Sequence, residues 1–349
     1  MLPDFASRLI LWQSCHGRHG LPWQAEGESP DPYPIWLSEI MLQQTQVDTV
    51  IPYYQRFLAR FPDIASLAVA EEDEILALWS GLGYYSRARN LHAAARVIQH
   101  QHAGRFPREH TAIQALPGIG RSTAAAIAAF AFNQCLAILD GNVKRVLARV
   151  FGVEGWPGDK AVETRLWELA EALLPEHGIR AYTQGIMDLG ATVCTRGSPR
   201  CGACPLTEEC VAHREGRQKE LPGPRPKKGL PEKSTAMLVM VHAGEVLLEK
   251  RPGSGIWGGL WSLPECLPNE EVDQAAKRLG LHVLACGALP GLVHGFTHFR
   301  LTIQPWRLDV GRPVRAEAPG RLWLPLAELE GAALPAPVRR ILAPLAISR

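Results

Sequence analysis

Hydrophobic residues recur at every third or fourth position through much of the first 215 residues. The pattern is clear in EDEILALWSGLGYYSRARNLHAAARVIQHQ, residues 72–101, and in TRLWELAEALLPEHG, residues 164–178. This spacing places apolar side chains on one face of a helix, and the glycines and prolines between the runs mark helix ends. We therefore predict an all-helical part over residues 1–215.

Beyond residue 233 the pattern changes to alternation of apolar and polar residues. STAMLVMVHAGEVLLEKR, residues 234–251, predicts two strands joined by a turn at Ala243 and Gly244. LVHGFTHFRLTIQPWRL, residues 292–308, has the alternation and aromatic content of further strands. Residues 234–349 are therefore predicted to form an α+β domain.

A basic, proline-rich stretch separates the two parts. From Arg214 to Lys233 there are seven Lys or Arg residues against three Glu residues, with prolines at positions 222, 224, 226 and 231. Such a composition predicts an extended, solvated linker, which we place at residues 216–233. The total length of 349 residues also favours more than one domain.

The whole-chain composition changes this interpretation little. Hydrophobic residues make up 46% of the chain and charged residues 21%, as in ordinary globular proteins, and a net charge of +2 does not by itself indicate a nucleic-acid partner. The N-terminus lacks the basic start and long apolar core of a secretory signal, and no apolar run has the length of a membrane span. We therefore expect a cytoplasmic protein that is not attached to a membrane.

Four of the eight cysteines lie within seventeen residues, in CTRGSPRCGACPLTEEC. The spacing C-x6-C-x2-C-x5-C brings Cys194, Cys201, Cys204 and Cys210 around one point. In a chain without an export signal, such a cluster predicts a metal site rather than disulfides. Zinc sites usually pair two short knuckles across a longer loop, whereas four closely spaced cysteines after a helix are compatible with a [4Fe-4S] cluster.

The segment LPGIG, residues 116–120, joins two predicted helices. Gly118 and Gly120 allow positive backbone dihedral angles and bring backbone amides close to a partner. Those amides, together with the positive end of the helix that begins near Ser122, suit a phosphate oxygen. An ordinary interhelical turn that ends in glycine explains the same residues, so the motif alone does not decide between the two.

Two carboxylates lie in surroundings that suit acid–base chemistry. Glu39 is the only ionisable residue in IWLSEIML; burial there would raise its pKa toward that of a general acid, and a position on the wet side of an amphipathic helix is the alternative. Asp140, in ILDGNVKRVLARV, could cap the next helix or face a ligand. The basic residues Lys144, Arg145 and Arg149 are spaced so that at least two could contact a phosphate, or form a solvated face.

Together these motifs resemble the helix-hairpin-helix DNA glycosylases that carry an iron-sulfur cluster, and among them the MutY family of adenine DNA glycosylases. The resemblance covers nearly the whole chain, through LPW, WLSEIMLQQTQV, GLGYYSRARNLH, LPGIGRSTA, ILDGNVKRVLARV, the four cysteines, GLWSLPE and FTHF. It implies a multidomain fold, in which an all-α helix-hairpin-helix glycosylase core with a [4Fe-4S] cluster subdomain is followed by an α+β Nudix-like domain. The implied ranges are a six-helix core at about residues 25–134 with its hairpin at 116–120, a cluster subdomain from residues 1–24 and 135–215, and an 8-oxoguanine recognition domain at 234–349.

The resemblance implies excision of adenine paired with 8-oxoguanine or guanine in double-stranded DNA, by a monomer that acts on the chromosome. Glu39 would protonate N7 of adenine, Asp140 would stabilise the sugar cation or trap it covalently, and Asn142 would help to position water. Ser122 stands where bifunctional glycosylase/lyases of the endonuclease III type carry a lysine, so water is expected to complete the reaction. Such a lyase acting on oxidised pyrimidines, and a non-catalytic iron-sulfur DNA-binding protein, are the alternatives.

Further residues are implied to contact DNA. Trp23 and Gln24 would line the adenine pocket, where an aromatic face and an amide suit a flipped purine. Gln44 and Tyr84 would insert near the orphaned base, with Leu82 beside them, although core packing explains Leu82 almost as well. The hairpin and the residues after it would hold the backbone through Gly118, Gly120, Ser122 and Lys144.

The C-terminal part resembles Nudix pyrophosphatases but lacks their magnesium-binding cluster. Where those enzymes carry R-E-x-x-E-E, this chain has ECLPNEEVDQAAKRLG, with Glu270 and Glu271 but no such cluster in register. We therefore expect recognition of 8-oxoguanine rather than hydrolysis, through Phe296, Thr297 and His298. The family more often has serine at the middle position, so Thr297 keeps the hydroxyl and adds a methyl group.

Overall fold

The computed structural model describes residues 4–24, 27, 30–226, 229–311 and 319–347. Contacts divide the chain into two units, Met1–Val69 with Ala93–Lys227 and Ala70–His92 with Lys228–Arg349. Lys227 and Lys228 of the predicted linker lie outside the described residues, and the last two linker residues already belong to a strand that begins at Glu232.

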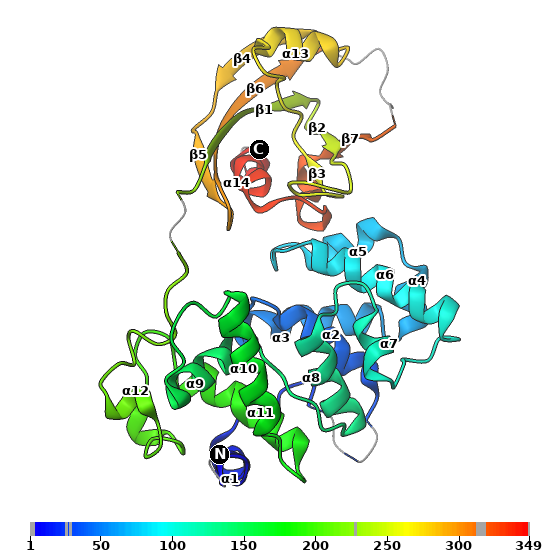
Figure 1. Cartoon of the computed structure of the whole chain (residues 1–349). Helices are drawn as coiled ribbons and strands as arrows, with labels where there is room; N and C mark the ends of the chain where they lie inside the picture. Colours follow the sequence, from blue (N-terminus) through cyan, green and yellow to red (C-terminus); the bar gives the residue numbers. More distant parts are fainter. Residues whose placement is uncertain (1–3, 25–26, 28–29, 227–228, 312–318, 348–349) are drawn as a thin grey trace. The chain divides into compact units, whose positions relative to one another are not determined.

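The first unit is helical, which confirms the prediction for the N-terminal part (Figure 1). A π-helix follows the helix that ends at Asp188, and a short 3-10 turn occupies Cys201–Ala203. In chain order the α-helices are α1 (Phe5–His16), α2 (Pro32–Leu42), α3 (Val47–Arg60), α4 (Ile64–Val69), the later part of α6 (Ser86–Gln101), α7 (His110–Gln114), α8 (Arg121–Phe132), α9 (Gly141–Phe151), α10 (Lys160–Ala172), α11 (Ile179–Asp188) and α12 (Val211–Arg214).

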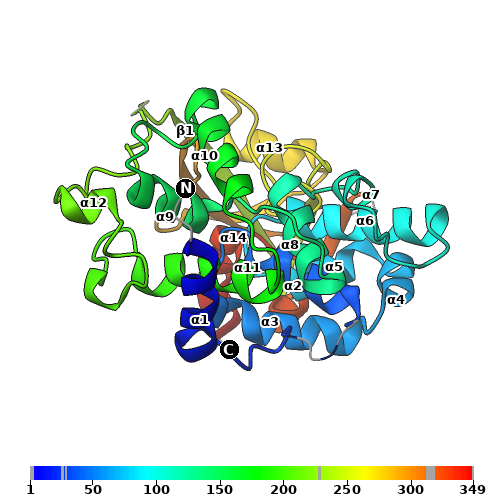
Figure 2. The same cartoon turned by 60° about the horizontal axis from the view of Figure 1, so that its bottom comes forward.

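An apolar core joins α1 to helices much later in the chain. Leu9 of α1, Leu147 of α9 and Leu166 of α10 are fully buried in it. Helix α1 lies beside α11 (Figure 2), and a Cβ added at Gly185 would come within 3.2 Å of the Leu9 carbonyl oxygen. The close approach of α1 and α11 brings the loop after α1 next to the end of α11, where the site described below is formed.

The turn between α7 and α8 has the predicted position but not all of the predicted geometry. Gly118 has a φ of +78°, in the left-handed region that favours glycine. Gly120 instead has a φ of −88° and a ψ of 171°, so the prediction of a positive dihedral angle was wrong for this residue. The reason is that Gly120 is the extended N-cap of α8, which begins at Arg121.

The second unit contains a mixed sheet (Figure 1), as predicted for an α+β domain. The strand order is β3-β2-β1-β6-β4, with β7 paired to β2 and β5 paired to β6; β1 and β6 are parallel, and the other described pairs are antiparallel. The strands are β1 (Glu232–His242), β2 (Glu245–Lys250), β3 (Trp261–Ser262), β4 (Val283–Ala288), β5 (Leu292–Gly295), β6 (Arg300–Val310) and β7 (Arg321–Pro325). The helices are α5 (Glu72–Trp79), the start of α6, α13 (Val272–Arg278) and α14 (Ala336–Ile347), with a 3-10 helix at Leu326–Gly331.

Local sequence explains both the first hairpin and the packing of β1. Ala243 and Gly244, with φ values of 47° and 84°, form the predicted turn, and His242 pairs with Glu245. Leu238 and Met240 pack in a core with Ala275 and Ala276 of α13. The residue between Leu238 and Met240 points to the opposite face of the sheet. Helix α14 lies on that face (Figure 1).

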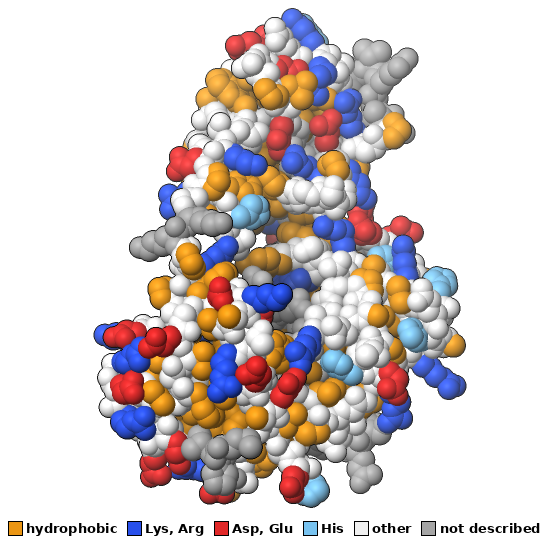
Figure 3. Space-filling model, viewed as in Figure 1, with side chains coloured by type: hydrophobic (Ala, Val, Ile, Leu, Met, Phe, Trp, Pro, Cys, Tyr) orange, Lys and Arg blue, Asp and Glu red, His pale blue; other side chains and the backbone are white. Residues whose placement is uncertain are grey.

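Acidic and basic side chains are interspersed over the face of the first unit drawn in Figure 3. This mixture agrees with the nearly neutral net charge of +2. Within the described part of the chain, the helices are too short or too polar to span a bilayer.

Candidate active site

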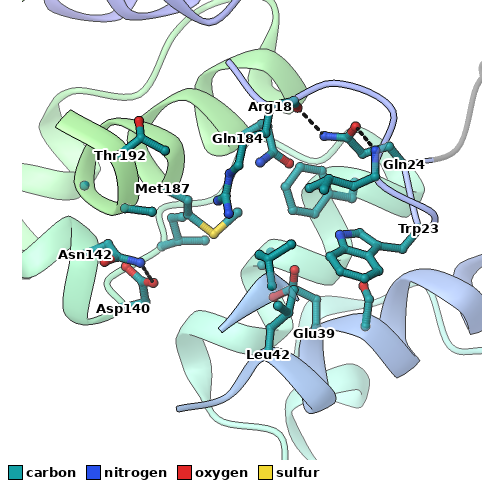
Figure 4. Close-up of a pocket in the computed structure, with 18 of the residues that line it drawn as sticks. Arg18, Trp23, Gln24, Glu39, Leu42, Asp140, Asn142, Gln184, Met187 and Thr192 are labelled. Carbon is teal, nitrogen blue, oxygen red and sulfur yellow. Dashed lines mark hydrogen bonds between the residues drawn. The ribbon is translucent and has the colours of Figure 1, made fainter. Parts of the chain in front are cut away.

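A pocket of about 1160 Å³ opens within the first unit (Figure 4). It is lined by segments that are far apart in sequence: the loop after α1, helix α2, helix α8, residues 138–142, helix α11 and the π-helix after it. Glu39 and Trp23 lie on one side of the open space and Asp140 with Asn142 on the other. The pocket therefore brings together both predicted catalytic carboxylates.

Glu39 faces this pocket from an otherwise apolar helix. Helix α2 begins with Pro32, and the Asp31 side chain caps it by accepting a hydrogen bond of 3.0 Å from the Tyr33 amide. Seven residues of α2 are buried, including both neighbours of Glu39. Burial, with a smaller contribution from the charge of Asp140, raises the pKa of Glu39 to about 8. The raised pKa agrees with the first interpretation. The alternative also holds in part, because the neighbours of Glu39 on α2 are buried while Glu39 itself is only partly buried and lines the open pocket.

Asp140 is both a helix cap and a wall of the pocket. As the N-cap of α9 it accepts a hydrogen bond of 2.8 Å from the Val143 amide, and the Asn142 side-chain amide donates to its other oxygen at 3.2 Å. Burial raises the pKa of Asp140, whereas these hydrogen bonds and the nearby charge of Arg145 oppose that shift. Asp140 can therefore cap the helix and face a ligand at the same time. Capping uses one carboxylate oxygen, and the side chain still lines the pocket.

Asn142 links Asp140 to the cysteine region. Its side-chain oxygen accepts a hydrogen bond of 2.9 Å from Arg145 Nη2. The same guanidinium donates to the carbonyl oxygens of Gly190 and Cys194, both at 2.7 Å. A Cβ at Gly190 would come within 2.6 Å of the Asn142 side chain, so glycine is needed for this packing. Asn142 is therefore held in one orientation at the edge of the pocket.

The other predicted pocket residues are also in place. Trp23 is buried and meets Tyr54 edge to face, with ring centroids 5.3 Å apart. Gln24 accepts a hydrogen bond from the Leu21 amide at 3.0 Å and donates to the Arg18 carbonyl at 2.8 Å. Ser122 lines the pocket and its hydroxyl oxygen accepts the Leu139 amide at 2.9 Å, so it ties α8 to the segment that ends at Asp140.

The basic residues of α9 are engaged within the protein. Lys144 donates to the carboxylate of Glu163 and to the carbonyl of Pro157. Arg149 is only 3% exposed, so the prediction that this guanidinium could face a phosphate or solvent was wrong. The reason is that four backbone carbonyls and the Cys194 sulfur surround it and accept its hydrogen bonds.

The residues predicted to insert into DNA lie outside this pocket. Gln44 is exposed and has a φ of 61°, unusual for a residue with a side chain. Tyr84 in the second unit is 46% exposed, with a φ of 50° and the Arg87 guanidinium 5.4 Å from its ring centroid. Leu82 is 5% exposed, as expected from the core-packing interpretation of this residue.

The FTHF motif forms the turn between β5 and β6. The Phe296 amide donates to the Phe299 carbonyl at 2.9 Å, and the two rings stack with centroids 4.4 Å apart. Phe296 also contacts Trp257 and His294, whereas Thr297 and His298 are exposed at the tip. The motif therefore presents a hydroxyl and an imidazole on an aromatic base.

Glu270, one of the two acidic residues singled out in the second unit, forms an ion pair. Arg278 donates to both carboxylate oxygens of Glu270, at 2.8 and 3.0 Å, and to the Glu265 carbonyl at 3.0 Å. The guanidinium lowers the pKa of Glu270. Glu270 is therefore held in place by Arg278.

The four clustered cysteines line one small cavity. Cys194, Cys201, Cys204 and Cys210 share it and are not joined by disulfides. Burial, with the nearby thiols adding to it, raises the pKa of Cys204 to about 12. Over the described residues, no three His, Cys, Asp or Glu side chains are grouped tightly enough to bind a single metal ion. The four cysteines that line this cavity are the residues that could hold a metal cluster.

Several pocket residues were missed from the sequence. The residues Arg18, Gln184, Met187 and Thr192 line the pocket. The side chains of Arg18 and Thr192 both donate hydrogen bonds to Asp188 at the end of α11. A usable signal was present, because Gln184 and Asp188 are polar residues four apart on one helix and therefore lie on the same face.

Two protein-family models match the chain. Residues 37–172 match the HhH-GPD superfamily base excision DNA repair protein, and residues 235–344 match the NUDIX domain. The first range contains Glu39, the hairpin and Asp140, and the second contains the whole sheet of the second unit apart from the start of β1.

Curated relatives cover nearly the whole chain. An adenine DNA glycosylase of Buchnera aphidicola subsp. Acyrthosiphon pisum is 38% identical over 97% of this chain and 96% of its own length. Adenine DNA glycosylases of Mus musculus and Homo sapiens are 35% and 34% identical over 97% of this chain, and the matches span 77% and 73% of those longer proteins.

Solved structures resemble the helical part. A thermostable thymine-DNA glycosylase is 31% identical with a TM-score of 0.54, covering 60% of this chain and 95% of that one. An endonuclease III bound to DNA is 20% identical with a TM-score of 0.52, covering 63% of this chain and all of that one, which shows a shared fold.

Proposed function

The chain belongs to the family of adenine DNA glycosylases, and from this premise we propose that it excises adenine mispaired with 8-oxoguanine or guanine in double-stranded DNA. The observation that carries the proposal is that one pocket holds both an acid with a raised pKa, Glu39, and the carboxylate that caps α9, Asp140. Two carboxyl groups with different environments are what hydrolysis of a glycosidic bond requires.

In the first step Glu39 donates its proton to N7 of the flipped adenine. A pKa near 8 keeps about nine tenths of Glu39 protonated at pH 7, so the acid is available. Protonation makes adenine a better leaving group, and the C1′–N9 bond breaks with its electron pair passing to N9. Trp23 and Gln24 line the pocket where the base would lie.

In the second step Asp140 stabilises the positive charge on the sugar, or forms a bond to C1′. Its hydrogen bonds from Val143 and Asn142 fix the carboxylate and favour its charged form. Water then adds to C1′ and gives its proton to Glu39, which restores the acid; where Asp140 has bonded to C1′, that bond breaks in the same step and its electron pair returns to the carboxylate. Asn142 positions Asp140 and the water.

Ser122 supports hydrolysis rather than lyase chemistry. Its hydroxyl oxygen accepts a hydrogen bond from the Leu139 amide, so the side chain serves the backbone instead of acting as a nucleophile. A lyase needs an amine that can form a Schiff base with the sugar, and a hydroxyl cannot do so.

The cysteine cavity supports a [4Fe-4S] cluster held by Cys194, Cys201, Cys204 and Cys210. When bound, the cluster would supply a rigid cross-link for the segment that follows α11. The contacts of Arg149 agree with a metal-binding role for these cysteines. Its buried guanidinium donates a hydrogen bond to Cys194 Sγ at 3.3 Å and would stabilise a thiolate there.

Recognition of the opposite base is assigned to the second unit, through Phe296, Thr297 and His298. Thr297 and His298 are exposed and within 3.3 Å of each other through Oγ1 and Nδ1, so they offer hydrogen-bonding groups to a base edge. Gln44 and Tyr84 are the exposed candidates for filling the space left by the flipped base. We propose that the protein acts as a monomer.

A single-turnover assay tests the proposal on a duplex with adenine opposite 8-oxoguanine. Aliquots are split and treated with or without hot alkali before the strands are separated. Release of adenine with breaks mainly after alkali is expected, because hydrolysis leaves an intact abasic site. Equal cleavage without alkali would instead indicate a lyase, and absence of adenine release would overturn the proposal. Glu39→Gln should abolish release, and Glu168→Gln, on the exposed face of α10, is the matched control.

A further inference from the structure

The loop after α1 supplies six residues of the pocket lining, including Trp23 and Gln24, but has little backbone structure of its own. Between Gly17 and Gln24, backbone hydrogen bonds within or next to the loop join Gly17 to Gln13 and Gln24 to Leu21, both at 2.9 Å. A pocket wall that must hold a base in one orientation needs a firmer support than these turns provide.

Asp188, the last residue of α11, supplies that support. It is completely buried, and its Oδ2 accepts the Arg18 backbone amide at 2.8 Å. Its Oδ1 accepts hydrogen bonds from Arg18 Nε at 2.7 Å and from the side-chain amide of Gln184 at 2.8 Å, and lies 2.7 Å from Arg18 Nη2 in an ion pair. One carboxylate therefore holds both the backbone and the guanidinium of a single loop residue.

The hydrogen bonds continue from Asp188 to the pocket on two routes. On the first, the Arg18 carbonyl accepts the Gln24 side-chain amide, whose oxygen in turn accepts the Leu21 amide (Figure 4). On the second, Gln184 lies one helical turn before Asp188 and lines the pocket directly. Donation of its N–H to Asp188 sets the direction of its side-chain oxygen. A single buried charge thus orients two amides that face the pocket from different elements.

We propose that Asp188 is the positioning residue for the base-binding side of the pocket, acting through Arg18 on Gln24 and directly on Gln184. Asp188 does not itself line the pocket, so it would not touch the base. The proposal rests on the proposed function, because it names the residue that holds the base side of that same site. It is independent of Glu39 and Asp140, which are held by α2 and α9.

The test compares wild type, Asp188→Asn, Arg18→Gln and the double variant as full-length protein. Asparagine retains the shape of the side chain and removes its charge. The measurements are the single-turnover rate on adenine opposite 8-oxoguanine, the active fraction, and dissociation constants for two duplexes. One duplex contains 2′-fluoro-adenosine, whose electron-withdrawing fluorine prevents cleavage, and the other contains a tetrahydrofuran abasic site. Glu168→Gln is again the control for loss of a carboxylate.

We expect Asp188→Asn to lower the rate about 100-fold and to weaken binding of the fluoro-adenosine duplex, because misplacement of about 1 Å has effects of this size. Binding of the abasic duplex, which places no base in the pocket, should stay within about threefold, since the affected contacts are with the base. The double variant should be no slower than Asp188→Asn, because Asp188 acts through Arg18.

Three results would overturn the positioning role: an unchanged rate for Asp188→Asn, a parallel loss of binding to both duplexes, or additive effects of the two substitutions. If Asp188→Asn does not fold, Arg18→Gln carries the same expectation, because the Arg18 side chain is 30% exposed and more tolerant of change. Absence of adenine release by the wild type would overturn the proposed function, whereas release by the wild type with an unchanged Asp188→Asn would overturn the positioning role alone.

Discussion

Glu39 is predicted to destabilise the folded protein increasingly as the pH rises. Its pKa in the folded protein is about 8, against an ordinary value of 4.5. The folded chain therefore holds a proton that the unfolded chain loses between these two values. Stability is unaffected below pH 4.5, falls as the pH rises toward 8, and changes no further above that pH.

The size of this effect follows from proton linkage. With these pKa values the loss of unfolding free energy is about 1 kcal/mol at pH 5 and about 3 kcal/mol at pH 7. Glutamine has nearly the same shape and does not ionise. The variant Glu39→Gln should therefore gain about 2 kcal/mol over the wild type between pH 5 and pH 7, while losing the ability to release adenine.

Urea unfolding at pH 5, 6, 7 and 8 measures this difference, with the circular dichroism of helices as the signal. Glu168→Gln, which removes an exposed carboxylate, should show a difference that is small and independent of pH. In the activity assay, the wild-type rate should fall about tenfold per pH unit above pH 8 as the acid is lost. If wild type and Glu39→Gln differ in unfolding free energy by the same amount at pH 5 and pH 7, the pKa of Glu39 is not raised by folding. The argument that Glu39 is a general acid would then be wrong.

Other substitutions separate structural from chemical roles. Asp140→Asn should leave the unfolding free energy within about 0.5 kcal/mol, because asparagine is an equally good helix cap, yet lower the single-turnover rate about 100- to 1000-fold; an unchanged rate would make Asp140 a cap only. Gly118→Ala should lower the unfolding free energy by about 1 kcal/mol because Gly118 has a positive φ. Gly120→Ala should change it by less than about 0.5 kcal/mol, since no atom lies within 4 Å of the added Cβ. Urea unfolding compares the two variants, and equal losses of unfolding free energy would contradict the geometry of the turn. Arg149→Gln should lower the affinity for the cluster about tenfold, measured as iron retained per chain during dialysis against a chelator; unchanged retention would refute a role for its contact with Cys194.

Local properties of the chain were predictable from the sequence. The three- and four-residue spacing of apolar side chains is a direct consequence of helix geometry, so helices α5, α6 and α10 were located from residues 72–101 and 164–178. The turn at Ala243 and Gly244 was likewise predictable, because a tight hairpin needs residues that tolerate positive φ. The cysteine spacing and the carboxylate in IWLSEIML depend only on neighbours in the chain, and they indicated the kinds of chemistry to expect.

The tertiary structure decided how these groups are used. Periodicity shows which face of a helix is apolar but not what covers it, so only packing could tell that Glu39 faces the same pocket as Asp140, about a hundred residues away in the chain. For the same reason, the burial of Arg149 and of Leu82 could not be deduced from their neighbours. Asp188 and Arg18 are 170 residues apart, and no local pattern pairs them. Hydrogen bonds and pKa values depend on distance in space, which the sequence by itself does not specify.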